Sequence, residues 1–144
     1  MTERIVIAGG GHAAAQLIST LRQLKYDGEI VLVGEEDRLP YQRPPLSKGY
    51  LSGELAAERL YVKPATFYAE RDVQLRLGTR VTAIDREASA VLLDDDSRLP
   101  YDRLVLALGS HVRTLEVEGM GLPGTHYLRS IADVDAIRES LGAG

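Results

Sequence analysis

The feature that most constrains this chain is a glycine-rich turn between an apolar run and an amphipathic segment. Residues 9–14 read GGGHAA, a G-x-G-x-x-A pattern, and directly follow the apolar run 4–8. In such a pattern Gly9 permits a tight turn, Gly11 lets the backbone approach a pyrophosphate, and Ala14 lets the helix pack closely on the strand. The first helix amides and the helix dipole then face the phosphate charge. The sequence therefore predicts a dinucleotide-binding strand–turn–helix unit; the alternative is a tight turn without a ligand.

The segments that follow this turn have the periodicity that the motif requires. From His12 to about Lys25 apolar residues recur every three or four positions, which predicts a helix. Residues 29–33 form a second apolar run, which predicts a buried parallel strand. Glu35 comes next, where a carboxylate can accept hydrogen bonds from the adenosine ribose hydroxyls. Because an acid repels a 2′-phosphate, FAD or NAD is favoured over NADP; Glu36 competes for this role but should point to the other face.

The remaining pattern predicts an α/β fold of the Rossmann-like, FAD/NAD(P)-binding type, a three-layer ββα fold. Residues 34–55 show no clear period and predict a long loop, which is usually functional. Residues 104–108 predict a buried strand, and residues 130–133 read SIAD, a capping box at the start of a helix that runs to Leu141. An antiparallel meander inserted into the parallel sheet is predicted from three short runs: 80–85, 90–93 and 98–101. Two further elements are expected, a short helix at 64–70 and a strand at 73–77.

Composition excludes several classes of function. The chain has 144 residues, no cysteine and a net charge of −4. Without cysteine there is no disulfide, thiolate zinc site, iron–sulfur cluster or redox dithiol in this segment, so redox chemistry would need a bound cofactor. Mild acidity disfavours a nucleic-acid binder, and no apolar run reaches the ~20 residues that span a membrane. Residues 1–11 lack the apolar stretch of a signal peptide, so a cytoplasmic protein is expected. The histidines share no spacing, so no metal site and no catalytic histidine is expected.

A proline-stiffened loop presents two cations. Residues 39–48 read LPYQRPPLSK, and the consecutive prolines would hold Arg43 and Lys48 on a preset scaffold. A positive charge beside a flavin ring would stabilise its anionic reduced form and raise its reduction potential. The residues alone leave an alternative open, an ordinary surface loop with solvated cations.

Three stretches that follow the glycine motif in the sequence resemble those of a known family. They are residues 43–48 (RPPLSK), 101–107 (YDRLVLA) and 127–129 (YLR), in this order. Together they resemble the FAD-dependent, NADH-dependent ferredoxin reductases of bacterial monooxygenase and dioxygenase systems, the putidaredoxin/rhodocoxin reductase-like group. This group has the pyridine nucleotide-disulfide oxidoreductase fold without the redox dithiol. The resemblance implies FAD as the cofactor, NADH as the co-substrate of the intact enzyme and a ferredoxin-type iron–sulfur protein as the partner.

The resemblance also implies roles for single residues. Ala13 and Glu35 would contact the pyrophosphate and the ribose. Lys48 would lie near the reactive edge of the isoalloxazine, Val81 would touch adenine through its backbone, and Arg129 would bind near the phosphate and sugar region. From the motif and the resemblance together, the residues expected to bind the cofactor are Gly9, Gly11, His12, Ala13, Ala14, Glu35, Arg43, Lys48, Val81, Ala107, Gly109 and Arg129.

Two positions depart from the pattern of this group. Leu108 stands where its members usually have threonine, so a polar side-chain contact is lost while the backbone of Ala107 and Gly109 can still serve. Asp96 stands where the hairpin turn usually has glycine, which can change the type of turn without changing the chemistry.

Two functional hypotheses follow. The first is the FAD-binding portion of an oxidoreductase that passes electrons from NADH through flavin to a ferredoxin-type iron–sulfur protein, with no catalytic side chain of its own. Residues 1–144 would then be the N-terminal part of an FAD-binding domain, and the NAD-binding and C-terminal domains of the group would be absent. The second is a non-catalytic dinucleotide-binding module, or a partner subunit that completes its flavin site with another chain; the short length supports it.

Overall fold

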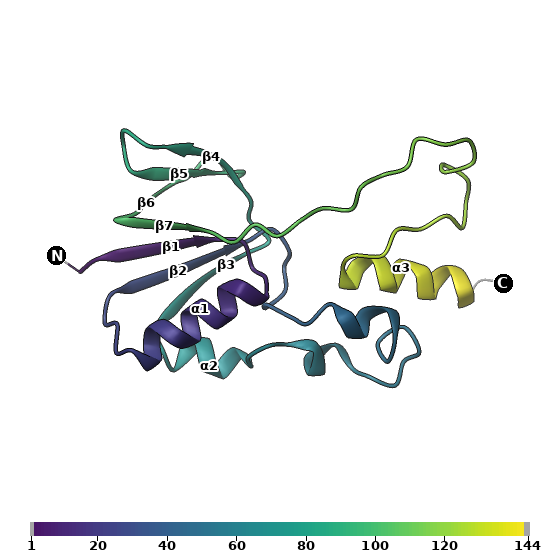
Figure 1. Cartoon of the computed structure of the whole chain (residues 1–144), viewed down its shortest axis with the longest axis horizontal. Helices are drawn as coiled ribbons and strands as arrows, with labels where there is room; N and C mark the ends of the chain where they lie inside the picture. The colour runs from purple at the N-terminus through teal and green to yellow at the C-terminus, as the bar shows by residue number, and fades with distance from the viewer. Residues whose placement is uncertain (1, 143–144) are drawn as a thin grey trace. The chain divides into compact units, whose positions relative to one another are not determined.

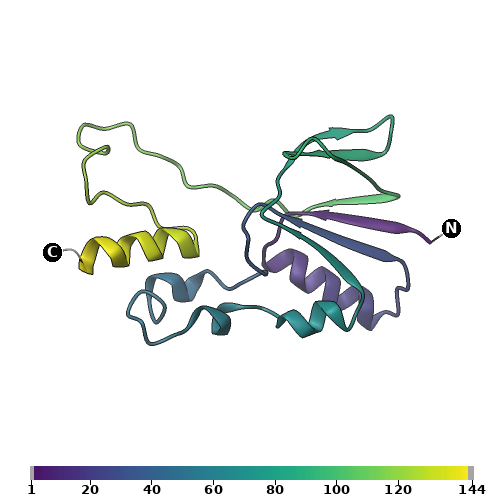
Figure 2. The same ribbon diagram turned by 180° about the vertical axis from the view of Figure 1, so that it is seen from behind.

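Contacts divide the chain into two compact units, and each is described by itself. The computed structural model describes residues 2–142. The first unit comprises Met1–Tyr41 and Tyr61–Gly109, and the second comprises Gln42–Leu60 and Ser110–Gly144. Figure 1 shows their helices and strands, and Figure 2 shows the same ribbon from behind.

Four parallel strands form the centre of the first unit. Across the sheet they are β3 (Val73–Leu77), β2 (Glu29–Gly34), β1 (Arg4–Ala8) and β7 (Arg103–Leu106). The chain passes from β1 through β2 to β3, moving toward one edge of the sheet, and then returns to place β7 on the other side of β1. The sheet therefore has a topological switch point between β1 and β7, where open α/β sheets bind their ligands at the carboxyl ends of the strands.

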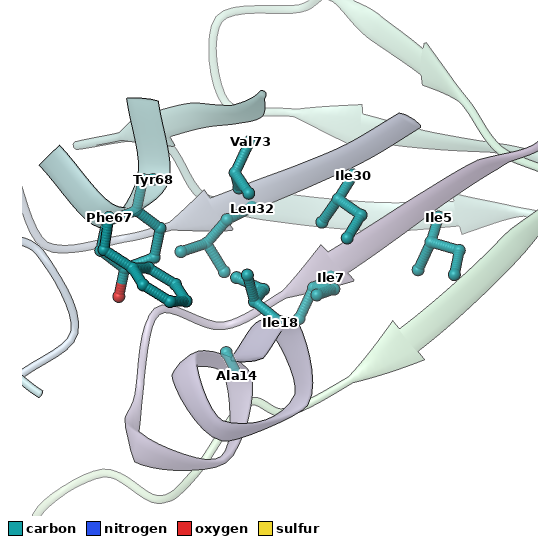
Figure 3. Packing of buried hydrophobic residues seen from close by; sticks show 9 residues of the cluster. All are labelled: Ile5, Ile7, Ala14, Ile18, Ile30, Leu32, Phe67, Tyr68 and Val73. Carbon is teal, nitrogen blue, oxygen red and sulfur yellow. The ribbon is translucent and has the colours of Figure 1, made fainter. Parts of the chain in front are cut away.

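Alternating side chains along the strands build three layers. Ile5 and Ile7 of β1 lie on the side of the two helices, α1 (His12–Gln23) and α2 (Ala65–Ala69). Figure 3 shows the buried cluster on this side, which consists of Ile5, Ile7, Ala14, Ile18, Ile30, Leu32, Phe67, Tyr68 and Val73. Val6, between the two isoleucines, points the other way and joins a second cluster with Val31, Val33, Val91, Leu93 and Leu99. Helices, parallel sheet and a second sheet thus form the predicted ββα layers, and that prediction is confirmed.

The second sheet is the predicted antiparallel meander. Its strands, in spatial order, are β4 (Val81–Asp85), β5 (Ala90–Leu93) and β6 (Arg98–Pro100). Asp96 in the β5–β6 turn has φ +63°, a left-handed conformation that aspartate tolerates better than most residues. This explains how aspartate can stand where glycine is usual.

The prediction for residues 104–108 is wrong in one respect. The strand covers Arg103–Leu106 and lies at the edge of the sheet, beside β1 alone. Leu106 is 56% exposed and Leu108 is 63% exposed, so this run is not a buried strand in the described structure. An apolar run of this length indicates a strand but does not encode its place in the strand order.

The second unit holds one regular helix and short helical turns. Its helix α3 covers Ile131–Gly142, and two 3₁₀ helices, η1 (Pro44–Ser47) and η2 (Ala57–Leu60), lie in and just beyond the stretch predicted as a loop. A single 3₁₀ turn has no amphipathic period, so sequence patterning does not reveal it. Leu46 of η1 is buried, as are Ile131 and Val134 of α3. In the part of the chain that the structure describes, every helix is too short or too polar to cross a membrane.

The hydroxyl of Tyr68 is a weak point of the helix-side core. Tyr68 is fully buried, its ring packs edge-on against Phe67 at 5.2 Å, and its hydroxyl has no hydrogen-bond partner among the described residues. Burial raises the pKa of Tyr68 to about 12. An unpartnered buried hydroxyl costs about 1–3 kcal/mol.

We therefore expect Tyr68→Phe to leave the free energy of unfolding unchanged or raise it by about 1 kcal/mol at neutral pH. The folded state favours the neutral phenol. As the pH rises above the pKa of tyrosine in the unfolded chain, the wild type should therefore lose stability until the folded-state pKa of about 12 is reached. Denaturant unfolding of both proteins from pH 8 to 12 would show the wild type falling by up to roughly 3 kcal/mol relative to the variant. Parallel curves would contradict this account.

Candidate functional site

Two backbone segments meet at the carboxyl edge of the parallel sheet, at its switch point. Gly9 follows β1, and its N–H donates a hydrogen bond to the carbonyl of Val33 at 2.8 Å. Ala107 follows β7, and its N–H donates to the carbonyl of Ala8 at 2.8 Å. These bonds hold the ends of β1, β2 and β7 side by side, so the glycine motif and Ala107 share one edge of the sheet.

Gly9 has to be glycine for a structural reason. Its φ is +112°, which side chains of L-residues rarely adopt. A Cβ at this position would lie 2.2 Å from the carbonyl oxygen of Ala107 and 2.6 Å from its carbonyl carbon. The tight turn and the approach of two backbones therefore both exclude any side chain here.

Gly11 has a different role, because it leaves space open. It is the N-cap of α1 in an extended conformation (φ −98°, ψ −169°), and a Cβ here would meet no described atom within 4 Å. No side chain caps this helix end, and the first turn holds no acidic residue. His12 and Ala13 are exposed, while Ala14 is buried in the helix-side core. The first amides of α1 thus meet both conditions for binding an anion, open access and a favourable helix dipole.

Glu35 lies beside the glycine motif. A Cβ on Gly10 would lie 3.3 Å from the Cα of Gly34, so the turn after β1 touches the end of β2 directly before Glu35. The carboxylate of Glu35 is exposed, whereas that of Glu36 accepts a hydrogen bond from the Tyr41 hydroxyl at 2.5 Å. The two neighbouring acids therefore have different surroundings, and that they point to opposite faces stays a prediction.

Backbone bonds attach the segment after β3 to the end of β2. The N–H of Thr79 donates to the carbonyl of Gly34 at 2.9 Å, and the N–H of Gly78 donates to that of Glu36 at 3.0 Å. Val81, the first residue of β4, follows directly and is paired with Leu93.

This connection places a residue that the sequence reasoning missed. Nη1 of Arg80 lies 3.6 Å from Oε1 of Glu35. The only signal for Arg80 in the sequence is its position after a Gly-Thr turn, because the two residues are far apart along the chain.

The first unit therefore brings together most of the predicted site residues. Those at or beside the carboxyl edge are Gly9, Gly11, His12, Ala13, Ala14, Glu35, Val81, Ala107 and Gly109. Gly109 has φ +66°, a conformation that favours glycine. Because the side chain of the preceding Leu108 is apolar, only the backbone can donate or accept hydrogen bonds at these two residues.

The second unit brings Arg43 and Arg129 together. The guanidinium of Arg43 donates to the carbonyl of Arg129 at 2.7 Å, and Nε of Arg129 donates to the carbonyl of Ser110 at 3.0 Å. Lys48 follows η1, is exposed, and has no side-chain partner within the described residues. That these three cations bind the cofactor stays a prediction.

The capping box predicted at 130–133 is confirmed, and it also holds the backbone of Arg129. Asp133 accepts the N–H of Ser130 at 2.7 Å and that of Arg129 at 2.9 Å, and its own N–H donates to the Ser130 hydroxyl at 3.2 Å. Burial raises the pKa of Asp133, but these hydrogen bonds and the charge of Arg43 together hold it below its ordinary value. The carboxylate is thus kept ionised at the start of α3, where the helix dipole also favours it.

Comparison with known proteins gives relatives that are named as ferredoxin reductases. A family model described as pyridine nucleotide-disulphide oxidoreductase matches residues 3–143. The chain is 42% identical to a probable ferredoxin reductase of Castellaniella defragrans, over 99% of this chain and 35% of the relative. It is 46% identical to the ferredoxin–NAD(+) reductase component of an anthranilate 1,2-dioxygenase system of Burkholderia cepacia, over 96% of this chain and 34% of the relative.

A solved structure of a reductase is also similar to this chain. The crystal structure of the covalent putidaredoxin reductase–putidaredoxin complex superposes with a TM-score of 0.89 at 41% identity, over 96% of this chain and 34% of that one. The chain thus spans about a third of the length of the relatives that it matches.

The two glycines of the motif should respond oppositely to substitution. Gly9→Ala should cost more than about 2 kcal/mol of unfolding free energy, because of its φ and the overlap with Ala107. Gly11→Ser should leave stability unchanged or raise it by up to about 1 kcal/mol, because serine is a favoured N-cap in this conformation. Thermal unfolding of the two variants would check this, and similar Tm losses in both would contradict it.

The carboxylate of Asp133 should stabilise the second unit. We expect Asp133→Ala to cost about 1–2 kcal/mol at pH 7, because two backbone N–H groups and the helix start lose their acceptor. Because its pKa is lowered in the folded state, this contribution is present above the unfolded pKa and is lost as pH falls through the folded pKa. Unfolding from pH 7 to 2 would show the two proteins converging at acidic pH. The exposed Glu139 of the same helix serves as a control, and Glu139→Ala should change little.

Proposed function

This chain belongs to the pyridine nucleotide-disulphide oxidoreductase family, and we propose that it binds FAD through the carboxyl edge of its parallel sheet. The protein to which this portion belongs would pass electrons from NADH through the flavin to a ferredoxin-type iron–sulfur protein. Family membership agrees with the resemblance seen in the motifs.

The observation that carries this proposal is the open, uncapped start of α1 at the switch point. With no side chain at Gly11, a pyrophosphate can come within hydrogen-bond distance of the amides that follow it. A serine, threonine or aspartate at this N-cap would satisfy these amides internally and compete with a phosphate. The site is therefore suited to an anion that approaches along the helix axis.

The adenosine end would lie across the end of β2. The exposed carboxylate of Glu35 can accept the ribose hydroxyls, and the backbone at Val81 would contact adenine. Ala107 and Gly109 would offer backbone groups to the cofactor on the other side of β1. In the second unit, Arg43, Lys48 and Arg129 are proposed as the cations that contact the cofactor.

When bound, FAD would supply the chemistry of accepting a hydride from a nicotinamide and releasing electrons one at a time. The side chains of this chain bind, orient and tune the cofactor in this scheme, and none needs to act as acid, base or nucleophile. The absence of cysteine from the sequence removes a redox dithiol from residues 1–144.

We propose that residues 1–144 form the N-terminal part of the FAD-binding domain, with the NADH site and further domains in the remaining length of a longer protein. The coverage of about a third of each relative supports this. The relatives are named as ferredoxin reductases, and one solved relative is a complex with putidaredoxin, which supports a ferredoxin-type partner.

Titration of the purified chain with FAD tests the proposal directly. We expect quenched flavin fluorescence and a raised Tm, because ligand that binds only the folded state stabilises it. Gly11→Ser should weaken FAD binding by at least about tenfold while it keeps the fold, because its hydroxyl occupies the phosphate position.

Gly121→Ser is the matched control. Gly121 also has no atom within 4 Å of an added Cβ, and it lies outside the glycine motif. Unquenched FAD with an unchanged Tm would refute the proposal. Electron transfer from NADH to a ferredoxin by the chain alone would instead exclude a non-catalytic binding module.

A further inference from the structure

One cation of the first unit lies beside the carboxylate expected to bind ribose. Nη1 of Arg80 is 3.6 Å from Oε1 of Glu35, and both belong to segments that the backbone holds in place. The N–H of Arg80 donates to Oδ1 of Asp94 at 3.1 Å, and its carbonyl accepts the N–H of Asp94 at 3.0 Å. The backbone of Arg80 is therefore fixed on both sides, and only its side chain is free to move.

The ion pair itself is weak, which leaves its members available to a ligand. The side chains of Arg80 and Glu35 are 60% and 51% exposed. Pairs this exposed contribute little to stability. In contrast, the pair between Arg4 and Glu29 at the other end of the sheet is shorter, 2.6 Å, and more buried, with side chains 32% and 25% exposed. The Arg4 pair is structural, whereas the Arg80 pair can exchange partners with an incoming nucleotide at small cost.

From this geometry we propose that Arg80 is a specificity-determining residue for the 2′ position of the adenosine ribose, with Glu35 as its counter-ion. A free 2′-hydroxyl is accepted by the carboxylate of Glu35. A 2′-phosphate needs a cation such as arginine in the same place, and it is rejected because Glu35 repels it and neutralises Arg80. The proposal rests on the proposed function, because it assumes that an adenosine ribose lies at Glu35.

The arrangement has a direct consequence for the charge at this site. The guanidinium of Arg80 faces the carboxylate of Glu35, whereas the carboxylate of Asp94 accepts the backbone N–H of Arg80. Among the described residues, Glu35 is thus the side chain that balances the charge of this guanidinium. Removing the charge of Glu35 should therefore convert Arg80 from a neutralised residue into a phosphate-binding residue without any new side chain.

The test is a double-mutant cycle read with two small probes, ADP and adenosine 2′,5′-bisphosphate, by calorimetry on the FAD-free chain. We expect the wild type to prefer ADP by at least about tenfold, the effect of one like-charge contact. Glu35→Gln should reduce this preference by about tenfold, mainly by tighter binding of the bisphosphate. Arg80→Ala added to Glu35→Gln should abolish that gain, and Arg80→Lys in the same background should keep part of it, because lysine restores the charge.

Arg98→Ala is the matched control. Arg98 is also 60% exposed and pairs with Asp85 at 3.2 Å on the antiparallel sheet, away from Glu35. Its replacement should leave the preference unchanged. If Arg80→Ala does not lower the affinity of the Glu35→Gln variant for the bisphosphate, the role of Arg80 is refuted while ADP binding by the wild type still supports a dinucleotide site. If the wild type binds neither ADP nor FAD, the proposed function itself fails.

Discussion

The near-contact between Gly9 and the peptide of Ala107 and Leu108 is the constraint on which the carboxyl edge of the parallel sheet depends. A Cβ on Gly9 would lie 2.2 Å from the Ala107 carbonyl oxygen and 3.0 Å from the Leu108 nitrogen. Because only hydrogen fits there, β1 and β7 stay paired up to their ends, and α1 begins immediately beyond the turn. Gly9 thus shapes the turn, while Gly11, with open space around it, is the glycine at which the proposed ligand would approach.

Local patterns were sufficient to predict much of the fold. The bounds of β1 and the start of α1 follow from an apolar run, a glycine turn and a helical period that adjoin one another. The capping box is equally local, since Ser130 and Asp133 bond reciprocally within one helical turn. The edge position of β7 could not be predicted, because the order of strands in a sheet depends on contacts between distant segments.

The same distinction applies to the site. The place of Glu35 beside the glycine turn could be predicted because the motif specifies its spacing from the glycines. Arg80 could not, because its pairing with Glu35 depends on the bonds that Gly78 and Thr79 make to the end of β2. Arg43 was predicted as a stiffly held cation, and its bond to the Arg129 carbonyl, 86 residues away, supplies a restraint beyond the prolines.

The proposed site uses two kinds of recognition, and they tolerate sequence change differently. At the phosphate end the contacts would come from backbone amides and small residues, so Leu108 can replace the usual threonine without removing a backbone donor. At the adenosine end, recognition would depend on two exposed side chains, Glu35 and Arg80, which form an ion pair at 3.6 Å. A substitution at the phosphate end therefore acts through shape, whereas one at the adenosine end acts through charge. In the proposed site, the choice among adenosine-containing ligands would consequently depend on a single ion pair, while the ability to bind any of them would depend on the glycine turn.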